Sequence, residues 1–522
     1  MTEPSLNLAT RFVDRNTDEG RGDCTALVGP AGSTTYAELA ELTNRVGNAL
    51  LELGVRPHQR VLLALADSPA FVATWYAVQK IGAVTAEVYT FLLPKDYAYY
   101  LDYTGATVVV VDGATLERVR EALSASPARP TLLVVDARET ALRHGEVSFE
   151  SLVARQPAHL DAAPTGRDDI AIWKFTTGST GRPKACAHTA RSPIASYEGY
   201  ARGVLDIRAD DIVLPVPKLF FGYARDLAAL FPFGVGACGV IFADRTTPEL
   251  IFELIARHRP TILVNVPTMM QAMLDHPSAS GQDLSCLRLC TSAGEALPEP
   301  LHHRWDDAFG VEVLDGIGSS EAYHIYISNR PGRVRPGSIG EVVPGYAADV
   351  VDDDGRPVPD GHIGRLWVRG ESASLRYWED EAASARTFAG SLVMSEDLVE
   401  RDPSGYFLYR GRADDLLKVG GIWVAPAEIE RCLATHPDVV ECAVVAAERN
   451  GLTRGCAWVV LKPGAVAAAE ELQDFVRQRL APHKVPRDVR LVDALPRTGS
   501  GKIDRSALRR LTTAGGTGGR QG

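Results

Sequence analysis

Apolar runs of strand length alternate with helix-length amphipathic segments along most of this chain. The run RVLLALAD, which begins at Arg60, is short and apolar, as a buried strand of a parallel sheet requires. A helix-like segment, PAFVATWYAVQKIGA, and a strand-like segment, TVVVVDG, follow it. The pattern recurs where a strand predicted from Ile262 to Val266 precedes helix-like TMMQAMLDH. Because this alternation builds βαβ units, the sequence predicts an α/β fold with mainly parallel sheets.

One helix start is marked by its capping residues. Thr35 and Glu38 have the spacing of a capping box, in which each side chain binds the backbone N–H of the other residue. Apolar residues then recur on one helical face. These residues are Leu39, Leu42, Val46, Leu50 and Leu53. An amphipathic helix is therefore expected to begin here.

The length of the chain and its local sequence patterns suggest how it divides into domains. With 522 residues, and at roughly 150 residues per domain, the chain can form three or four structural units. After about residue 335, short alternating runs separated by Gly, Pro and Asp predict a β-rich lobe, and a mixed pattern returns beyond residue 411. We expect an N-terminal domain over 1–413, a C-terminal domain over 414–511 and a disordered Gly/Thr-rich tail over 512–522.

Composition argues against several classes of protein. The net charge is -11, and no Lys/Arg run with interleaved aromatic residues occurs, which argues against a nucleic-acid partner. The first residues lack the pattern of a signal peptide, and the most apolar stretch, from Ala228 to Ala243, is short and broken by Pro232, so no membrane span is expected. Eight scattered cysteines without a CxxC pair suggest reduced thiols and a cytoplasmic protein.

A Gly- and hydroxyl-rich stretch, TTGSTGRPKACAHT from Thr176 to Thr189, could hold phosphate. It fails the Walker A pattern, because no G-K-[ST] follows at the required spacing. Its hydroxyls and backbone N–H groups, with Lys184 nearby, could still surround phosphate oxygens. By itself it is equally compatible with an exposed turn. A second pattern, GVGACG at 234–239, precedes a strand rather than a helix, and it therefore predicts a tightly packed turn rather than a dinucleotide site.

Three more groups of residues indicate a function when they are considered together with this stretch. Glu321 follows a Gly/Ser turn, where its carboxylate could hold Mg²⁺ on a nucleotide phosphate. Asp397 and Arg412 could hydrogen-bond a ribose diol, and Lys502 lies on a Gly-rich loop near the end of the chain. Each residue taken alone reads as an ordinary surface charge. No G-x-S-x-G occurs, and no histidine pairs recognisably with a nucleophile, so a hydrolase has little support.

In this order and at these distances, the four clusters resemble the adenylate-forming superfamily of acyl- and aryl-CoA synthetases, adenylation domains and firefly luciferase. The resemblance extends from about residue 10 to about residue 510. Within the superfamily the chain is most similar to benzoate-CoA ligases. This similarity is carried by PKLFFGYARDLAALFPFGVGA, GIGSSEAYHIYISNRPG and LLKVGGIWVAPAEIE.

The resemblance implies a fold and a set of residue roles. The fold would be a large N-terminal domain of two α/β lobes plus a β-rich lobe, followed by a small mobile α/β lid hinged at Asp414. ATP would be bound by Thr176, Thr177, Gly178, Ser179, Thr180, Gly181, Lys184, Gly294, Glu295, Asp315, Gly316, Asp397 and Arg412. The segment SAGEALP, which contains Gly294 and Glu295, would line the adenine together with Asp315 and Gly316. The catalytic residues would be Ser320 at the α-phosphate, Glu321 as the Mg²⁺ ligand and Lys502 as the lid lysine. The thiol acceptor would meet Gly420, Gly421 and Trp423.

The resemblance also implies an aryl pocket, lined by Phe221, Gly222, Tyr223, Gly318, Tyr323, His324 and Ile325. Gly222 stands where an alanine is common and would make room, and Gly318 would let the ring approach the backbone. Tyr323 stands where an aliphatic residue is common and would add a hydroxyl. These differences predict a hydroxy- or amino-substituted benzoate. Two further expectations are that the neighbours Arg225 and Asp226 pair with each other at the pocket rim, and that Glu396 points away from the nucleotide.

The implied reaction joins a small aromatic carboxylic acid to AMP, using ATP and Mg²⁺, and then forms a thioester with CoA. Lys502 would bridge the attacking carboxylate and the α-phosphate, where negative charge develops. Three alternatives remain at this point: transfer to the phosphopantetheine of a separate carrier protein, a nucleotide-binding regulator without turnover, and a luciferase-like oxygenase. The sequence does not decide the ring substituents, the acceptor, or whether the protein is a monomer or a homodimer.

Overall fold

A computed structural model describes residues 6–30, 32–137, 142–177, 182–413, 417–419, 422–424, 426–449, 452–498 and 503–514. The chain divides into two compact units. The first contains most of the described residues up to Ala348, together with Val368–Val393. The second contains Asp349–Trp367 and the described residues from Met394 onward. The expected boundary residue, Asp414, lies outside the described residues, so the domain limits remain a prediction.

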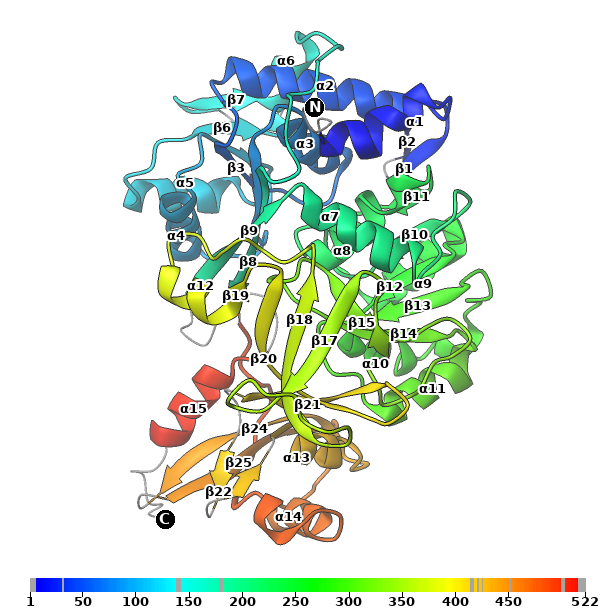
Figure 1. The fold of residues 1–522 in the computed structure, drawn as a ribbon, viewed down its shortest axis with the longest axis vertical. Coiled ribbons are helices and arrows are strands. Elements are labelled where there is room, and N and C mark those ends of the chain that lie inside the picture. The colour runs from blue at the N-terminus through cyan, green and yellow to red at the C-terminus, as the bar shows by residue number, and fades with distance from the viewer. Residues whose placement is uncertain are drawn as a thin grey trace. The chain divides into compact units, whose positions relative to one another are not determined.

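The first lobe of the first unit is built on a seven-stranded sheet (Figure 1). Its strand order is β7 (Glu146–Ser148), β6 (Thr131–Val134), β5 (Val108–Val111), β3 (Arg60–Ala64), β4 (Val84–Glu87), β8 (Ile170–Thr177) and β9 (Pro183–Thr189). The pairs from β7 through β8 are parallel. The helices are α2 (Tyr36–Glu52), α3 (Pro69–Lys80), α4 (Pro94–Thr104), α5 (Leu116–Ala125) and α6 (Phe149–Ala154).

Alternate residues of these strands face opposite helical layers, because side chains alternate along a strand. Val61 and Leu63 of β3 belong to the core that includes α2 and α3. Leu62 and Ala64 belong to the core that includes α4 and α5. The continuous apolar run in the sequence is therefore explained by burial on both faces. The capping box at the start of α2 is present, as predicted from Thr35 and Glu38.

A nine-stranded sheet forms the second lobe of the first unit. Its order is β16 (Glu341–Val342), β15 (Ile325–Ser328), β14 (Val313–Gly318), β13 (Leu289–Ser292), β12 (Ile262–Asn265), β10 (Ile212–Pro215), β11 (Cys238–Val240), β1 (Thr25–Gly29) and β2 (Gly32–Thr35). The strands from β14 through β1 pair in parallel, and both edges are antiparallel. Its helices are α8 (Gly222–Ala229), α9 (Pro248–His258), α10 (Pro267–Leu274) and α11 (Glu299–Phe309), and α7 (Arg191–Ser196) follows β9.

The turn at 234–239 is tightly packed, as the sequence predicted. A Cβ on Gly239 would lie 1.9 Å from the carbonyl oxygen of Ala228, and Gly236 has a φ of +81°. A side chain at the first position would clash, and one at the second would be strained. The glycines therefore allow β11 to pack against α8.

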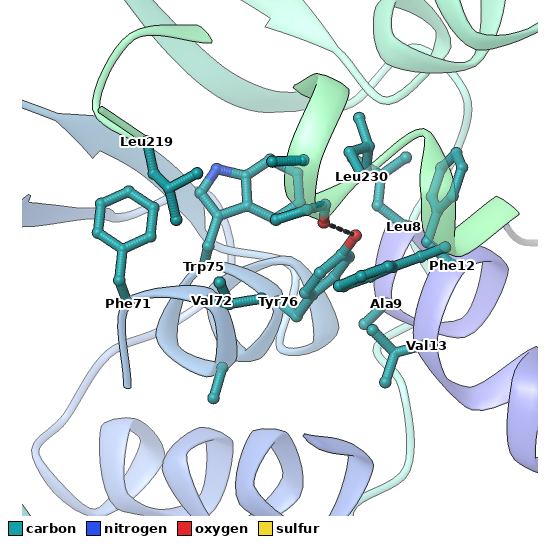
Figure 2. Packing of buried hydrophobic residues seen from close by; sticks show 14 of the residues in the cluster. Leu8, Ala9, Phe12, Val13, Phe71, Val72, Trp75, Tyr76, Leu219 and Leu230 are labelled. Atoms are coloured by element: carbon teal, nitrogen blue, oxygen red, sulfur yellow. Dashed lines mark hydrogen bonds between the residues drawn. The ribbon is translucent and has the colours of Figure 1, made fainter. Parts of the chain in front are cut away.

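Helix α8 is fixed by a core that both lobes of the first unit share. Figure 2 shows Trp75 and Tyr76 of α3 packed between Leu219 and Leu230, which flank α8. The hydroxyl of Tyr76 donates to the carbonyl of Ala229 over 2.7 Å (Figure 2). A buried, hydrogen-bonded aromatic residue of this size holds the helix in one position. The carboxyl end of α8 therefore has a rigid support.

A β-rich sheet follows in the chain, as predicted. Its order is β17 (Tyr346–Val351), β18 (Ile363–Gly370), β20 (Leu392–Arg401) and β19 (Phe388–Ala389), with β21 (Phe407–Arg412) pairing β20. Helix α12 (Glu381–Thr387) precedes β19.

The rest of the second unit is mixed α/β. Strands β24 (Val439–Arg449), β25 (Leu452–Leu461) and β26 (Asp488–Leu491) form one sheet, and β22 (Leu417–Val419) pairs β23 (Ile422–Val424). The helices are α13 (Pro426–Ala434), α14 (Ala469–Arg477) and α15 (Arg505–Ala514). The predicted α/β fold class is confirmed. Helix α15 includes 512–514, which the sequence assigned to the tail, and 515–522 lie outside the described residues.

Candidate functional site

Glu321 and Lys184, which are far apart in the chain, meet on the side chain of Tyr377. The Tyr377 hydroxyl donates to Glu321 Oε1 over 2.8 Å. Lys184 Nζ lies 5.3 Å from the centre of the Tyr377 ring and pairs with Asp380 over 2.8 Å. Burial raises the pKa of Tyr377, so its hydroxyl remains a donor. The structure thus brings the predicted metal ligand and the predicted phosphate-binding lysine into one cluster.

The chemistry of this cluster suits a metal ion that is shared with a ligand. Glu321 is partly exposed, and its carboxylate is a hard oxygen donor of the kind that Mg²⁺ prefers. Within the described part of the chain, no group of three or more His, Cys, Asp or Glu residues is placed to hold a metal. A single carboxylate is sufficient where substrate phosphates and water supply the other ligands. The residues therefore fit Mg²⁺ on a nucleotide.

Ser320 is held by a buried histidine that the sequence analysis did not single out. His188 Nε2 donates to the carbonyl of Ser320 over 2.6 Å, and its Nδ1 accepts from Ser192 over 3.1 Å. Burial lowers the pKa of His188 to about 3, so the ring is neutral. The Ser320 hydroxyl lies 3.3 Å from the carbonyl oxygen of Phe175 on β8. His188 therefore fixes the turn that carries Ser320 and Glu321. It was inside the quoted phosphate motif, but no local spacing marked it.

The residues expected at the adenine lie at the carboxyl ends of neighbouring parallel strands. Ser292 of β13 is opposite Asp315 of β14, and its hydroxyl donates to Asp315 Oδ1 over 2.9 Å. Burial raises the pKa of Asp315 to about 8. Gly294 has a φ of +87°, which favours glycine, and Glu295 accepts from Thr268 over 2.6 Å. In open α/β sheets this edge is where ligands bind.

Gly316 is required by strand pairing. A Cβ at this position would lie 2.7 Å from the carbonyl oxygen of Ile327 on β15. The predicted adenine-lining glycine therefore also permits the antiparallel pairing of β14 and β15.

The expected ribose-binding residues form a cross-strand pair in the second unit. Asp397 of β20 is opposite Arg412 of β21, with 3.4 Å between Asp397 Oδ1 and Arg412 Nη1. Ser395 donates to the other carboxylate oxygen over 2.9 Å. Glu396 is exposed and pairs with Arg365 over 2.8 Å, because successive residues of a strand point to opposite faces. Glu396 and Asp397 therefore lie on opposite faces of the strand, and the expectation that Glu396 points away from the nucleotide stays a prediction.

Elements of the second lobe bring the expected aryl-pocket residues together. Phe221, Gly222 and Tyr223 begin α8, and the remaining residues come from the β14–β15 hairpin. His324 Nε2 lies 3.3 Å from the carbonyl oxygen of Tyr223, and their ring centres are 5.7 Å apart. The rings of Tyr200 and Phe231 also pack against His324.

The expected reason for glycine at residue 222 is wrong, and Gly318 has a role within the fold in addition to the expected one. A Cβ on Gly222 would lie 2.6 Å from Lys174 Nζ, so the space beside this glycine is filled by a lysine. A Cβ on Gly318 would lie 2.6 Å from the carbonyl oxygen of His324, so this glycine is required by strand pairing. The expectation that Gly222 makes room for substrate overlooked Lys174, because the lysine is distant in the sequence.

The expected positions of Tyr323, Arg225 and Asp226 also need correction. The Tyr323 hydroxyl donates to Asp226 Oδ1 over 3.1 Å and contacts Arg225, so it is already engaged within the protein. Arg225 and Asp226 pair with each other over 2.7 Å, as expected, but both are buried rather than at a rim. Charged residues are almost never buried without partners, and here the partners come from other elements.

Several expected site residues lie partly or wholly outside the described part of the chain. Thr176 and Thr177 end β8, and the side chain of Thr177 is not described. Trp423 lies on β23 opposite Lys418, again without a described side chain. Gly178, Ser179, Thr180, Gly181, Asp414, Gly420, Gly421 and Lys502 are outside the described residues.

Parallel sheets of α/β enzymes bind ligands, nucleotides among them, outside the carboxyl ends of their strands, where Asp315 and the left-handed Gly294 lie. The chain belongs to the AMP-binding enzyme family: residues 14–378 match the AMP-binding enzyme family, and residues 428–502 match the AMP-binding enzyme C-terminal domain. It is similar to the benzoate–CoA ligase of Thauera aromatica, with 41% identity over 97% of this chain and 98% of that protein.

Two solved structures are similar over nearly the whole chain. An anthranilate CoA ligase in complex with anthranoyl-AMP has a TM-score of 0.92 at 37% identity, over 97% of each chain. A benzoate CoA ligase from Burkholderia xenovorans LB400 has a TM-score of 0.87 at 39% identity, over 96% of this chain and 99% of the other. Among the described residues, no helix is both long enough and apolar enough to span a membrane.

Proposed function

We propose that this protein activates an aromatic carboxylic acid with ATP, releases pyrophosphate, and transfers the aroyl group from the resulting aroyl-AMP to the thiol of CoA, with AMP as the leaving group. The observation that carries the proposal is the full-length similarity to a benzoate–CoA ligase, together with the Glu321, Tyr377 and Lys184 cluster. The proposed nucleotide site lies at the carboxyl edge of the sheet, where Asp315 and Gly316 would line the adenine. In the second unit, Asp397 and Arg412 would bind the ribose.

Adenylation brings two negatively charged groups together, and the chain's own residues must make this possible. Lys184 would steady the triphosphate, and Glu321 would hold Mg²⁺, which when bound would supply positive charge to the phosphates. Ser320, whose carbonyl is held by His188, would bind the α-phosphate. Lys502 would bridge the carboxylate and the α-phosphate. The face that contains Gly420, Gly421 and Trp423 would then admit the thiol.

A hydroxy- or amino-substituted benzoate is proposed as substrate, and His324 supports this choice. Burial lowers the pKa of His324 to about 3, so its ring is neutral. Because Nε2 faces a carbonyl, it must carry the proton, which leaves Nδ1 as an acceptor. Nδ1 is buried and has no hydrogen-bond partner among the described residues. An unpaired buried acceptor is costly, and an O–H or N–H on the substrate ring would satisfy it.

Incubation of the full chain with ATP, Mg²⁺, CoA and a panel of benzoates tests the proposal. Pyrophosphate release together with an aryl-CoA product, identified by mass spectrometry, is expected. Pyrophosphate release without aryl-CoA would instead favour a carrier protein as acceptor, which a phosphopantetheinylated carrier would then reveal. If no acid of the panel releases pyrophosphate, the proposed function is wrong.

A further inference from the structure

Four charged side chains and one tyrosine form a buried ion cluster beneath the start of α8. Glu87 ends β4, Lys174 lies on β8, and Arg225 and Asp226 lie on α8. Tyr323 lies in the turn between β14 and β15. Each charged side chain is at most 7% exposed. Two cations and two anions give the cluster no net charge.

The contacts within the cluster are extensive. Asp226 pairs with Arg225 over 2.7 Å and with Lys174 over 2.8 Å, and Arg225 also pairs with Glu87. Lys174 Nζ donates to the carbonyl of Tyr323 over 2.6 Å and lies 3.5 Å from the centre of its ring. Tyr323 has a φ of 72°, which is rare for a bulky residue and persists only where the surroundings hold it. The cluster supplies that restraint.

Burying four charges is costly, and apolar residues of similar volume often stabilise a fold at least as well. Stability alone therefore does not account for the cluster. The position of the cluster gives a functional reason for it, because the cluster lies directly behind residues that the proposed function assigns to the aryl pocket. Ionisable groups whose pKa values are strongly shifted are concentrated at functional sites.

Lys174 is the member of the cluster that packs against Gly222, a residue that the proposed function assigns to the aryl pocket. The last three atoms of its side chain occupy the space that a side chain at residue 222 would take, at 2.6 Å, 2.7 Å and 3.3 Å from an added Cβ. Residues 221–223 are partly exposed. An ammonium has three N–H donors, and the described hydrogen bonds of Lys174 use two of them. The third donor has no hydrogen-bond acceptor among the described residues, and the ammonium lies over the Tyr323 ring.

We propose that Lys174 is a specificity-determining residue of the aryl pocket and that its ammonium donates a hydrogen bond to a hydroxyl oxygen on the substrate ring. This inference rests on the proposed function. Asp226, Arg225 and Glu87 act as positioning residues, because Asp226 pairs with Lys174, Arg225 pairs with Asp226, and Glu87 pairs with Arg225.

The charge of the cluster and its hydrogen-bond donors and acceptors determine which substituent on the substrate ring is preferred. A phenolic hydroxyl can accept from Lys174, and a hydroxyl can also satisfy the acceptor Nδ1 of His324. An aromatic amine donates well but accepts poorly, because its lone pair is delocalised into the ring. A second carboxylate would add an uncompensated charge beside a neutral cluster, which is costly in a buried site. Hydroxybenzoates are therefore preferred over benzoate, aminobenzoates and dicarboxylates.

The test compares kcat/KM for 3- and 4-hydroxybenzoate, the matching aminobenzoates and benzoate in a pyrophosphate-release assay. The wild-type chain is expected to prefer a hydroxybenzoate. Lys174→Met should lower the ratio of kcat/KM for that hydroxybenzoate to kcat/KM for benzoate by about 10- to 100-fold, as for loss of a hydrogen bond from a charged donor. A purely structural role for Lys174 would lower kcat/KM for every acid equally, so an unchanged ratio would overturn the inference.

Two more variants keep the test decisive if Lys174→Met fails to fold. Lys174→Met combined with Asp226→Asn removes one cation and one anion, so the cluster stays neutral. Gly222→Ala leaves the cluster chemically intact but places a methyl group 2.6 Å from Nζ, which must move away. Both should lower the same ratio. If the wild-type chain activates none of the acids, the proposed function fails; if it activates them without a preference for hydroxyl, only the present inference fails.

Discussion

Replacing Asp226 with asparagine should destabilise the protein far more than removing an ordinary surface carboxylate. Asp226 is fully buried and accepts from Lys174, from two nitrogens of Arg225, and from the Tyr323 hydroxyl. Asparagine has nearly the same shape but no charge, so it would leave two buried cations facing one anion, Glu87. Breaking a buried pair in this way typically costs about 3 to 5 kcal/mol in the free energy of unfolding.

Urea unfolding, followed by tryptophan fluorescence and circular dichroism, measures this cost. The matched control is Glu396→Gln, which removes an exposed carboxylate paired with Arg365 and should cost less than about 1 kcal/mol. Equal costs for Asp226→Asn and Glu396→Gln would refute the reasoning. The double variant Lys174→Met with Asp226→Asn should recover part of the loss, because it restores charge balance.

The same cluster predicts a dependence on pH. Burial by itself would raise the pKa of Asp226, but the charges of Arg225 and Lys174 outweigh it and lower the pKa to about 2. Because this folded-state value lies below the ordinary value of 3.8, the contribution of Asp226 to stability is present above about pH 4 and is lost as the pH falls toward 2. The free energy of unfolding of Asp226→Asn should therefore fall less steeply over this range than that of the wild-type chain.

Three further substitutions test the proposed site. Tyr377→Phe removes the donor to Glu321 and should raise the Mg²⁺ concentration needed for half-maximal pyrophosphate release by about tenfold, as loss of an outer-shell hydrogen bond does; an unchanged Mg²⁺ titration would contradict this role. Gly318→Ala forces a contact in the hairpin and should cost about 1 to 3 kcal/mol in urea unfolding, whereas Gly281→Ala has open space and should cost little; similar midpoints would rule out the clash. Lys502→Ala should nearly abolish acid-dependent pyrophosphate exchange without changing the circular dichroism spectrum, and full exchange would disprove its bridging role.

Local chemistry in the sequence predicted the secondary structure well. The capping residues Thr35 and Glu38 marked a helix start that the structure contains, and the apolar run from Arg60 predicted a strand buried on both faces. Such features depend on neighbouring residues, so they are visible in the chain before it folds. The proposed nucleotide-site residues were predicted differently, because their order along the chain resembles one superfamily, and their roles stay a prediction.

The contacts of the expected aryl-pocket residues were decided by the tertiary structure. The sequence offered Gly222 as free space and Tyr323 as a free hydroxyl, but Lys174 fills the first and Asp226 binds the second. Glu87 and Arg225 are 138 residues apart, and no local pattern predicts their contact. The sequence by itself determined which elements form and which residues could bind ATP. Only packing decided which charges are buried together, because a buried charge is stable only beside partners that distant elements supply.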